Sequence, residues 1–340
     1  MRFLLFLIFF VLAGCQHEEI AYTSIPTPIA LNEPAHFPAA VYNNAKNPLT
    51  AAGIALGKKL FYDGNLSSDG VVSCGFCHLQ SHAFTHHGHN LSHGVYDRVG
   101  RRNTPAIQNV AFQESFMWDG AATFLDHVAI IPLTSEVEMD QSLQQILDYL
   151  KQDKTYAKMF VQAFGASNIT VGNFLNALAQ FMLTFDSSHS KYDQVMQDPS
   201  KSFTALEATG YALFNSKCSS CHATALFTDG SYRNTGLTMH PNLMDLGRYE
   251  TTLLDADRNK FKVPSLRNVE LTAPYMHDGR FLTLEAVLNH YTDGVVSYPN
   301  LDPMLERGIS LTAGDKVAII AFLKTLTDHQ FISNSKLSEY

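Results

Sequence analysis

The chain of 340 residues has little of several features that mark other protein classes. It has no run of Lys or Arg and a net charge of -8, which argues against nucleic acid and favours a basic partner over an acidic one. The apolar run from Phe3 to Leu12 is too short to span a bilayer. No long stretch alternates apolar and polar residues as a strand does, so we expect a mainly α fold.

Cysteine is also scarce, and its placement is informative. Four of the five Cys form two C-x-x-C-H motifs, Cys74-Gly75-Phe76-Cys77-His78 and Cys218-Ser219-Ser220-Cys221-His222. In this motif the two thiols form thioethers with haem and the His ligates the iron. A zinc site needs no His after each second Cys, and a thioredoxin-like pair needs a βαβ setting that the flanks lack. The sequence therefore predicts two covalently bound haem c groups.

The fifth cysteine follows the N-terminal apolar run. Arg2 and the run after it are typical of a secretory signal peptide. The segment Leu12–Cys15 (LAGC) resembles a bacterial lipobox, in which cleavage leaves an acylated Cys. The alternative is an ordinary signal peptide cleaved nearby. We expect residues 1–15 to be a lipoprotein signal peptide and the protein to be anchored through Cys15 on the periplasmic side of the cell envelope.

Residues 16–48 are polar and contain five Pro, which favours an extended tether, although part of the segment could pack across the domains. The length of the remaining chain suggests two domains that each bury a core and a haem. We expect an N-terminal haem domain at 49–190 and a C-terminal haem domain at 191–335.

Helical patterns recur around both motifs. The segments before them each contain Gly followed four residues later by Phe, and in c-type cytochromes such a helix crosses a C-terminal helix. The second helix of each pair follows Thr170 or the Thr312-x-x-Asp315 capping box, with apolar residues at a period of 3.6. The expected helices are Ala51–Tyr62, Leu143–Leu150, Thr170–Phe185, Ala205–Asn215 and Thr312–Leu326.

A second repeat lies after each motif. Residues 104–110 (TPAIQNV) match residues 263–269 (VPSLRNV), and an Asp-Gly pair follows each at the same spacing. We therefore expect two cytochrome c-like domains related by internal duplication, with long loops around haem. The ungapped alignment places Pro132 opposite Tyr291. If Tyr291 ligates the second iron, the first iron is open to small oxidants, because Pro132 has no side-chain donor.

These residues resemble the bacterial di-haem cytochrome c peroxidases and their relative MauG. The resemblance covers roughly residues 50–330. It implies reduction of hydrogen peroxide with electrons from a small cytochrome c or a cupredoxin. MauG-like oxidation of a partner protein or another substrate is the alternative, and a di-haem electron carrier without catalysis is a third. Besides the haem motifs, the segments that carry the resemblance are Gly100–Pro105, Phe116–Gly120, Glu136–Met139 and Thr272–Arg280.

The resemblance also implies roles for individual residues. Glu138 would lie on the distal side of the Cys74 haem and transfer a proton between the oxygens of peroxide, unless it is a solvated acid at a helix start. Trp118 would lie between the haems and relay electrons, unless it is a core residue. The side chain of Asn103 and the carbonyls of Thr272 and Pro274 match a calcium site between the domains. Because family members are often dimers, a homodimer is compatible with the resemblance.

The chain departs from the peroxidases at the first haem. Their distal His corresponds to Val95 and their distal Gln to Val128, so the first iron is open unless a nearby His substitutes. The candidates are His82, His86, His87, His89 and His93.

A second departure concerns the sixth ligand of the second haem. The peroxidases have Met at the position of Tyr291, and MauG has Tyr. A phenolate lowers the potential that a thioether would raise. Met276 and His290 are the competing ligands. Both departures favour the MauG-like alternative.

Overall fold

The computed structural model describes residues 26–165 and 169–339. The predicted signal peptide, Cys15 and the first part of the tether lie outside these residues. In the described part, no helix is long and apolar enough to cross a membrane. The helices are α1 (Ala51–Phe61), α2 (Cys74–Cys77), α3 (Leu125–Val128), α4 (Ile130–Thr134), α5 (Leu143–Gln152), α6 (Lys154–Phe164), α7 (Val171–Met182), α8 (Lys191–Gln197), α9 (Ala205–Lys217), α10 (Tyr249–Thr252), α11 (Leu284–Asn289), α12 (Ala313–Lys324) and α13 (His329–Ile332).

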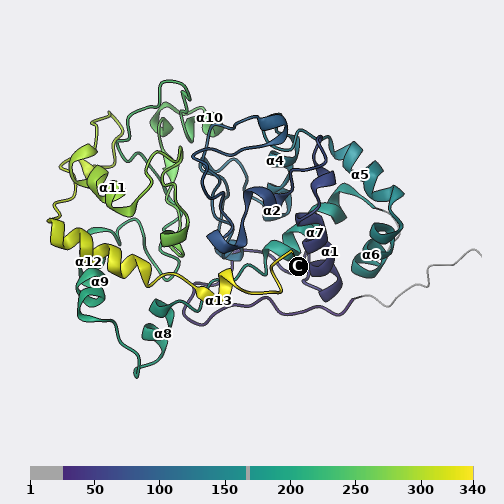
Figure 1. Cartoon of the computed structure of the whole chain (residues 1–340), viewed down its shortest axis with the longest axis horizontal. Helices are drawn as coiled ribbons and strands as arrows, with labels where there is room; N and C mark the ends of the chain where they lie inside the picture. The colour runs from purple at the N-terminus through teal and green to yellow at the C-terminus, as the bar shows by residue number, and fades with distance from the viewer. Residues whose placement is uncertain (1–25, 166–168, 340) are drawn as a thin grey trace, which may run out of the picture.

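The expectation of a mainly helical fold is confirmed. The sheet found in the described part of the chain has two antiparallel strands, β1 (Tyr232–Arg233) and β2 (Phe261–Lys262), with Tyr232 opposite Lys262. Long loops connect the remaining helices (Figure 1).

Two hydrophobic cores lie next to each other along the molecule (Figure 1), one around α1 and α7 and one around α9 and α12. A Cβ added at Gly57 would overlap the carbonyl oxygen of Ala177, and one at Gly210 would overlap that of Ala318. Glycine therefore lets each helix pair cross at close range. The predicted crossing pairs are thus confirmed, with the predicted Thr170 cap on α7 and the predicted Thr312 capping box on α12.

The two halves share local geometry at positions that the sequence repeat equates. Asn109 and Asn268 both have left-handed backbone conformations, with φ of 51° and 58°. The antiparallel bridge Phe116–Ala122 has its counterpart in Tyr275–Phe281. These equivalences are what an internal duplication predicts, and the duplication itself stays an inference.

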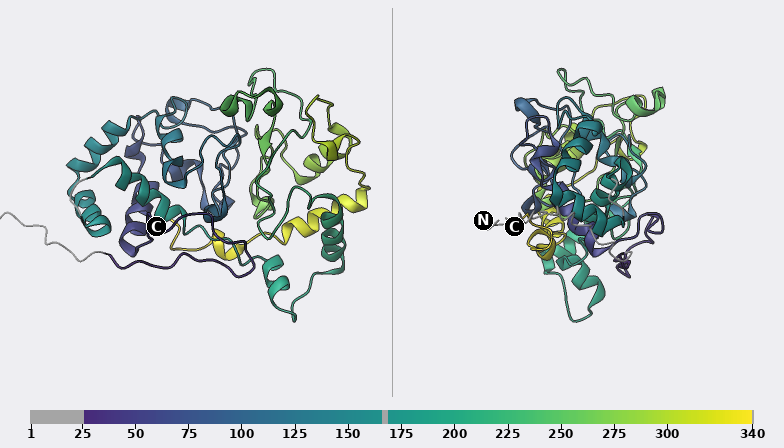
Figure 2. Two further views of the ribbon diagram at one scale, coloured as in Figure 1. Left: turned by 180° about the vertical axis from the view of Figure 1, so that it is seen from behind. Right: turned by 90° about the vertical axis from the view of Figure 1, so that its right-hand side faces the viewer.

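Residues 26–48 of the predicted tether, which we call the strap, are packed on the protein, which is the alternative that the sequence left open. The strap runs along one long side of the molecule and reaches both halves (Figure 2). The amide of Val41 donates to the carbonyl of Ala111 at 2.9 Å, and Phe37 is buried against Phe112. A free tether therefore cannot extend beyond residue 25, because the strap is packed.

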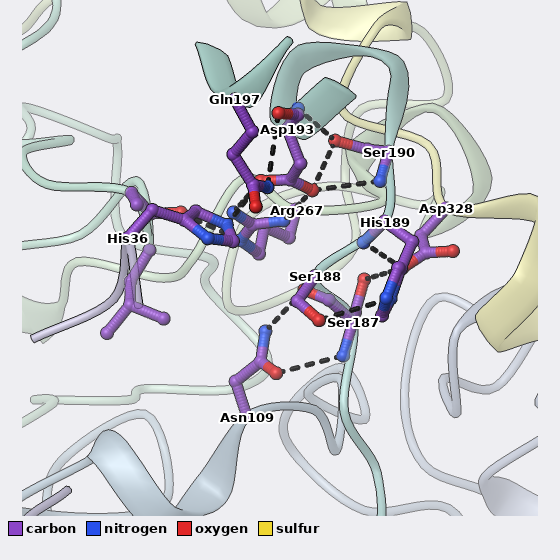
Figure 3. Close-up of polar contacts among 12 residues, drawn as sticks. His36, Asn109, Ser187, Ser188, His189, Ser190, Asp193, Gln197, Arg267 and Asp328 are labelled. Atoms are coloured by element: carbon purple, nitrogen blue, oxygen red, sulfur yellow. Dashed lines mark hydrogen bonds and ion pairs between the residues drawn. The ribbon is translucent and has the colours of Figure 1, made fainter. Parts of the chain in front are cut away.

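The strap also contacts the second half through a buried ion pair (Figure 3). The Nε2 of His36 lies 2.9 Å from Asp193, whose carboxylate pairs with Arg267 at 2.7 Å. The Arg267 guanidinium also lies 4.6 Å from the centre of the Phe37 ring. In the same region Asn109 donates to the carbonyl of Ser187 at 3.1 Å. The strap and the segment between the two halves thus meet in one polar cluster.

The C-terminal residues after α12 pack on the first half, although the prediction assigned residues up to 335 to the second domain. Phe331 and Leu337 belong to the first core, not the second. Gln80 donates to the carbonyl of Phe331 at 3.1 Å, and Tyr62 donates to that of Leu337 at 2.7 Å. The chain therefore returns to its first half after α12, because these apolar side chains complete the first core.

Candidate haem and peroxide sites

The first haem motif forms a short helix whose sequence places both thiols and the His together. Ser73 caps α2 by accepting from the amide of Phe76 at 3.2 Å, and His78 ends the helix. The Nδ1 of His78 donates to the carbonyl of Phe84 at 2.7 Å, which leaves Nε2 free for a metal. Burial lowers the pKa of His78 to about 4, so the ring is neutral near pH 7, as ligation requires.

The second motif has the same arrangement after α9. The Nδ1 of His222 donates to the carbonyl of Phe227 at 3.0 Å, and burial lowers the pKa of this His. Neither Cys218 and Cys221 nor Cys74 and Cys77 form a disulfide.

These residues fit haem c. In each motif, two cysteines that form no disulfide lie beside a His whose Nδ1 is bonded to a backbone carbonyl, which leaves its Nε2 for iron. This is the donor set that haem c requires. In residues 26–165 and 169–339, no three His, Cys, Asp or Glu side chains are placed to hold a metal ion.

Glu138 lies next to the first motif, on a loop pinned by residues 92–95. Its carbonyl accepts the amide of Val95 at 2.8 Å, and a Cβ at Gly94 would overlap the Glu138 backbone. Burial raises the pKa of its carboxyl, against a hydrogen bond from Ser92 that lowers it. Burial and the charge of Glu138 together raise the pKa of the Cys77 thiol to about 12. The carboxyl group is therefore close to the first haem attachment site.

The histidines of the 82–93 loop contact each other. The rings of His82 and His87 stack at 3.8 Å, and those of His86 and His89 at 4.2 Å. The ring of His93 faces the exposed Asp97 at 3.7 Å. His86 is also buried, and its ring lies 5.6 Å from that of Phe76 in the first motif. Burial and the charges of His89, His78 and His93 lower the pKa of His86 to about 4. Val95 is fully buried and bonded to the loop of Glu138, and ligation of the first iron by a loop His stays a prediction.

Tyr291 is placed at the second motif by a π-helical turn, η7 (His290–Gly294). Burial raises the pKa of its phenol, and the charges of Cys221 and Cys218 raise it further, so its hydroxyl is near both thiols. The competing His290 has its Nε2 bound to the carbonyl of Thr235 at 2.9 Å. Met276 adopts a left-handed backbone conformation with φ of 71°.

Pro132 and Val128, at the corresponding part of the first half, lie on α4 and α3. The carbonyl of Pro132 accepts the amide of Met139, at 3.1 Å, which ties α4 to the loop of Glu138. The side chain of Pro132 has no ligand atom for the first iron, whereas Tyr291, at the equivalent position of the second half, has a phenol.

Trp118 lies at the contact between the two halves. Its indole Nε1 donates to the carbonyl of Asn103 at 2.8 Å, and its own carbonyl accepts the amide of Lys262 at 2.7 Å. The amide of Asn103 donates in turn to the carbonyl of His277 at 2.7 Å. The repeat equates Asn103 with Lys262 and Trp118 with His277, so two equivalent bonds cross the contact in opposite directions.

The residues of the predicted calcium site are Asn103, Thr272 and Pro274, and Asn103 lies at the contact between the halves. Asn103 is buried and its amide nitrogen donates to the carbonyl of Asn90 at 3.0 Å. The hydroxyl of Thr272 donates to Val269 at 3.3 Å, and Pro274 follows a cis peptide bond. No contact joins Asn103 to Thr272 or Pro274 among the bonds of the described residues, and the calcium site stays a prediction.

Sequence reasoning missed the ion pairs that join the halves. Arg102 pairs with Asp119 at 2.6 Å in its own half and with Asp245 at 2.7 Å in the other. These carboxylates hold the pKa of Arg102 above its usual value, although burial acts in the opposite direction. Arg102 lies in the recognised Gly100–Pro105 segment, which was the available signal, whereas nothing near Asp245 marked it.

Comparison with known proteins shows which protein family the chain belongs to. A family model described as "Di-haem cytochrome c peroxidase" matches residues 51–201. The methylamine utilization protein MauG of Methylorubrum extorquens is 36% identical over 298 residues, which cover 85% of this chain and 82% of that protein. The chain belongs to the di-haem cytochrome c peroxidase and MauG family.

Two further members of the family show how widely the similarity extends. Cytochrome c551 peroxidase of Nitrosomonas europaea is 33% identical over 302 residues, covering 84% of this chain and 83% of that protein. The crystal structure of a MauG-like protein associated with microbial copper homeostasis has a TM-score of 0.83 and 30% identity, covering 92% of this chain and 99% of that one. Peroxidases and MauG proteins are therefore both relatives of this chain, and membership implies an oxidoreductase with two haem c groups.

Proposed function

We propose that the protein reduces hydrogen peroxide to water at the first haem site, with electrons that a small cytochrome c or a cupredoxin delivers through the second. The observation that carries the proposal is the carboxyl group of Glu138 beside Cys77, with its pKa raised by burial. A carboxyl group in such a position suits proton transfer during the cleavage of an O–O bond.

The residues would act as follows. Haem c, attached to Cys74 and Cys77 and ligated by His78, would supply the iron that binds peroxide and the electrons that reduce it. The Glu138 carboxylate accepts the proton of the near peroxide oxygen and returns it to the far oxygen, which leaves as water. The buried Val95 covers this side without offering a ligand. Each turnover consumes one peroxide, two electrons and two protons and yields two waters.

The second half has a different task in this proposal. Tyr291 at the second motif closes that site to peroxide, and Trp118 at the contact between the halves relays electrons to the first site. The test is consumption of peroxide by the loaded protein with a reduced small cytochrome c as donor. Stoichiometric oxidation of two donor molecules per peroxide supports the proposal, and no oxidation of either a cytochrome or a cupredoxin contradicts it.

A second candidate is MauG-like oxidation of a partner protein or another substrate by peroxide. The observations that favour it are Val95 in place of a distal His and Tyr291 in place of Met. Peroxide added to the fully oxidised protein separates the two functions. A high-valent spectrum formed without prior reduction favours the MauG-like function, and a requirement for one-electron reduction favours the peroxidase.

We also propose that the protein is exported and anchored by lipid at Cys15. The support is the LAGC segment after an apolar run, together with covalent haem attachment, which belongs to the same compartment. The native protein should incorporate radiolabelled palmitate, and replacing Cys15 by Ser should abolish the label. Absence of label from the native protein would argue against the anchor.

A calcium ion between the halves, bound by Asn103, Thr272 and Pro274, is the remaining proposal. Oxygen donors of this kind prefer a hard cation. Metal analysis of the purified protein, with Asn103→Ala as the variant, tests it. One calcium per chain in the native protein and none in the variant is the expected result.

A further inference from the structure

Lys262 extends from the second half of the chain to the first-half loop that carries Trp118. Its ammonium donates to Oε1 of Gln113 at 2.8 Å and to the carbonyl of Ser115 at 2.7 Å. Its backbone amide donates to the carbonyl of Trp118 at 2.7 Å. One residue thus makes three hydrogen bonds to residues 113–118, and two of them have a charged donor, which strengthens them.

The ammonium sits among neutral groups. Both of its acceptors are uncharged oxygens, and the ring of Phe116 lies 6.0 Å from its nitrogen. Burial lowers the pKa of Lys262 to about 8, which leaves the side chain mostly protonated at neutral pH. A half-buried cation of this kind costs desolvation free energy that an apolar side chain of equal length would avoid. Packing alone therefore does not account for a lysine here.

Neighbouring residues of the second half hold the same loop. Tyr232, the strand partner of Lys262, has its hydroxyl 2.6 Å from Oγ of Ser115. The guanidinium of Arg248 lies 3.7 Å from the centre of the Tyr232 ring and donates to the carbonyl of Asp119 at 3.0 Å. The loop is therefore clamped before and after Trp118.

We propose that Lys262 is a positioning residue for electron transfer between the two haem units, because its ammonium fixes the loop that holds the Trp118 indole against the opposite half. This inference rests on the proposed function, in which Trp118 relays electrons to the peroxide site. One electron passes in each step, and Lys262 neither gains nor loses one. A displaced loop would loosen the hydrogen bond from the Trp118 indole to Asn103, and small displacements of this kind slow electron transfer.

The test replaces Lys262 by Met, which keeps the length of the side chain and removes the ammonium. Lys201→Met, at an exposed loop position, is the control. Trp118 is the only tryptophan, so its ultraviolet resonance Raman spectrum reports the indole hydrogen bond directly. We expect the hydrogen-bonded indole band to be lost in Lys262→Met, and electron redistribution between the haems after pulse reduction to slow about tenfold or more. An unchanged indole band and an unchanged rate, with both haems attached, would overturn the proposal.

If Lys262→Met does not fold, a second variant tests the same contact. Gln113→Leu removes one acceptor of the ammonium and leaves Lys262 in place. It should shift the indole band and the rate in the same direction by a smaller amount, and no shift would overturn the proposal. Neither readout uses peroxide, so normal peroxide turnover in a Glu138→Gln protein would contradict the proposed function and leave this test intact.

Discussion

The backbone amide of Val95 donates to the carbonyl oxygen of Glu138 at 2.8 Å. This backbone bond joins the loop of Val95 to the loop of Glu138, whose charge, together with burial, raises the pKa of the Cys77 thiol. Val95 is fully buried, so its loop is firmly held. The proposed roles of Val95 and Glu138 at the first haem depend on this arrangement.

The first prediction concerns Val95. If Val95 covers the first iron, Val95→His should place an imidazole within reach of that iron and give a six-coordinate, low-spin ferric spectrum at the first haem. Peroxide should then react only after reduction. Val99→His, at a position 53% exposed, is the control and should leave the spectrum unchanged. Identical spectra for both variants would show that residue 95 lies away from the iron.

The second prediction is a pH dependence set by Glu138. Burial raises the pKa of its carboxyl, and the carboxylate form is the one that accepts a proton. The rate of reaction with peroxide should therefore fall as the pH drops through this raised pKa, above the ordinary value of about 4.3. Ser92→Ala removes the hydrogen bond that lowers the pKa, so the acid limb should move to higher pH. Rate constants measured against pH for both proteins check this, and a limb that moves to lower pH contradicts it.

The third prediction concerns the ligand at the second haem. Tyr291→Met should raise the reduction potential of that haem, because a thioether replaces an anionic phenolate. Redox titration and the absorption spectrum of the second haem measure the change. Haem content should stay at two per chain. An unchanged second-haem spectrum would exclude ligation by Tyr291.

The fourth prediction tests the strap. Phe37→Ala should lower the free energy of unfolding by about 3 kcal/mol, because it removes a buried ring that packs on Phe112 and Arg267. Phe124→Ala, at a ring 65% exposed, should change it by less than about 0.5 kcal/mol. Denaturant unfolding of the haem-loaded proteins compares them. Equal stabilities would mean that the strap behaves as a free tether in solution.

Local signals in the sequence were enough to predict the helix pairs and the haem-binding His. The 3.6-residue period after Thr170 and Thr312 gave α7 and α12, because capping and periodicity are encoded within a few residues. The strap and the return of Phe331 to the first core were not predictable in this way. Their stability comes from contacts with residues far along the chain, such as Val41 with Ala111, and a Pro-rich segment has no period that reveals them.

In the candidate site, too, local motifs predicted some residues and long-range contacts placed the others. The C-x-x-C-H motifs identified His78 and His222 from spacing alone, and the carbonyls of Phe84 and Phe227 that orient them follow within six residues. Lys262 carried no signal, since its acceptors lie some 150 residues earlier in the chain. Contacts between the halves depend on how two folded units meet, which no local pattern encodes.

The most direct test of the central claim is a stopped-flow measurement of peroxide reacting with the haem-loaded protein and with Glu138→Gln. The control is Glu136→Gln, which alters an exposed acid two residues away. Glu138→Gln should slow the reaction by roughly 10²- to 10⁴-fold with both haems in place, while Glu136→Gln should react normally. A Glu138→Gln protein that reacts with peroxide at the native rate would show that Glu138 does not transfer the proton.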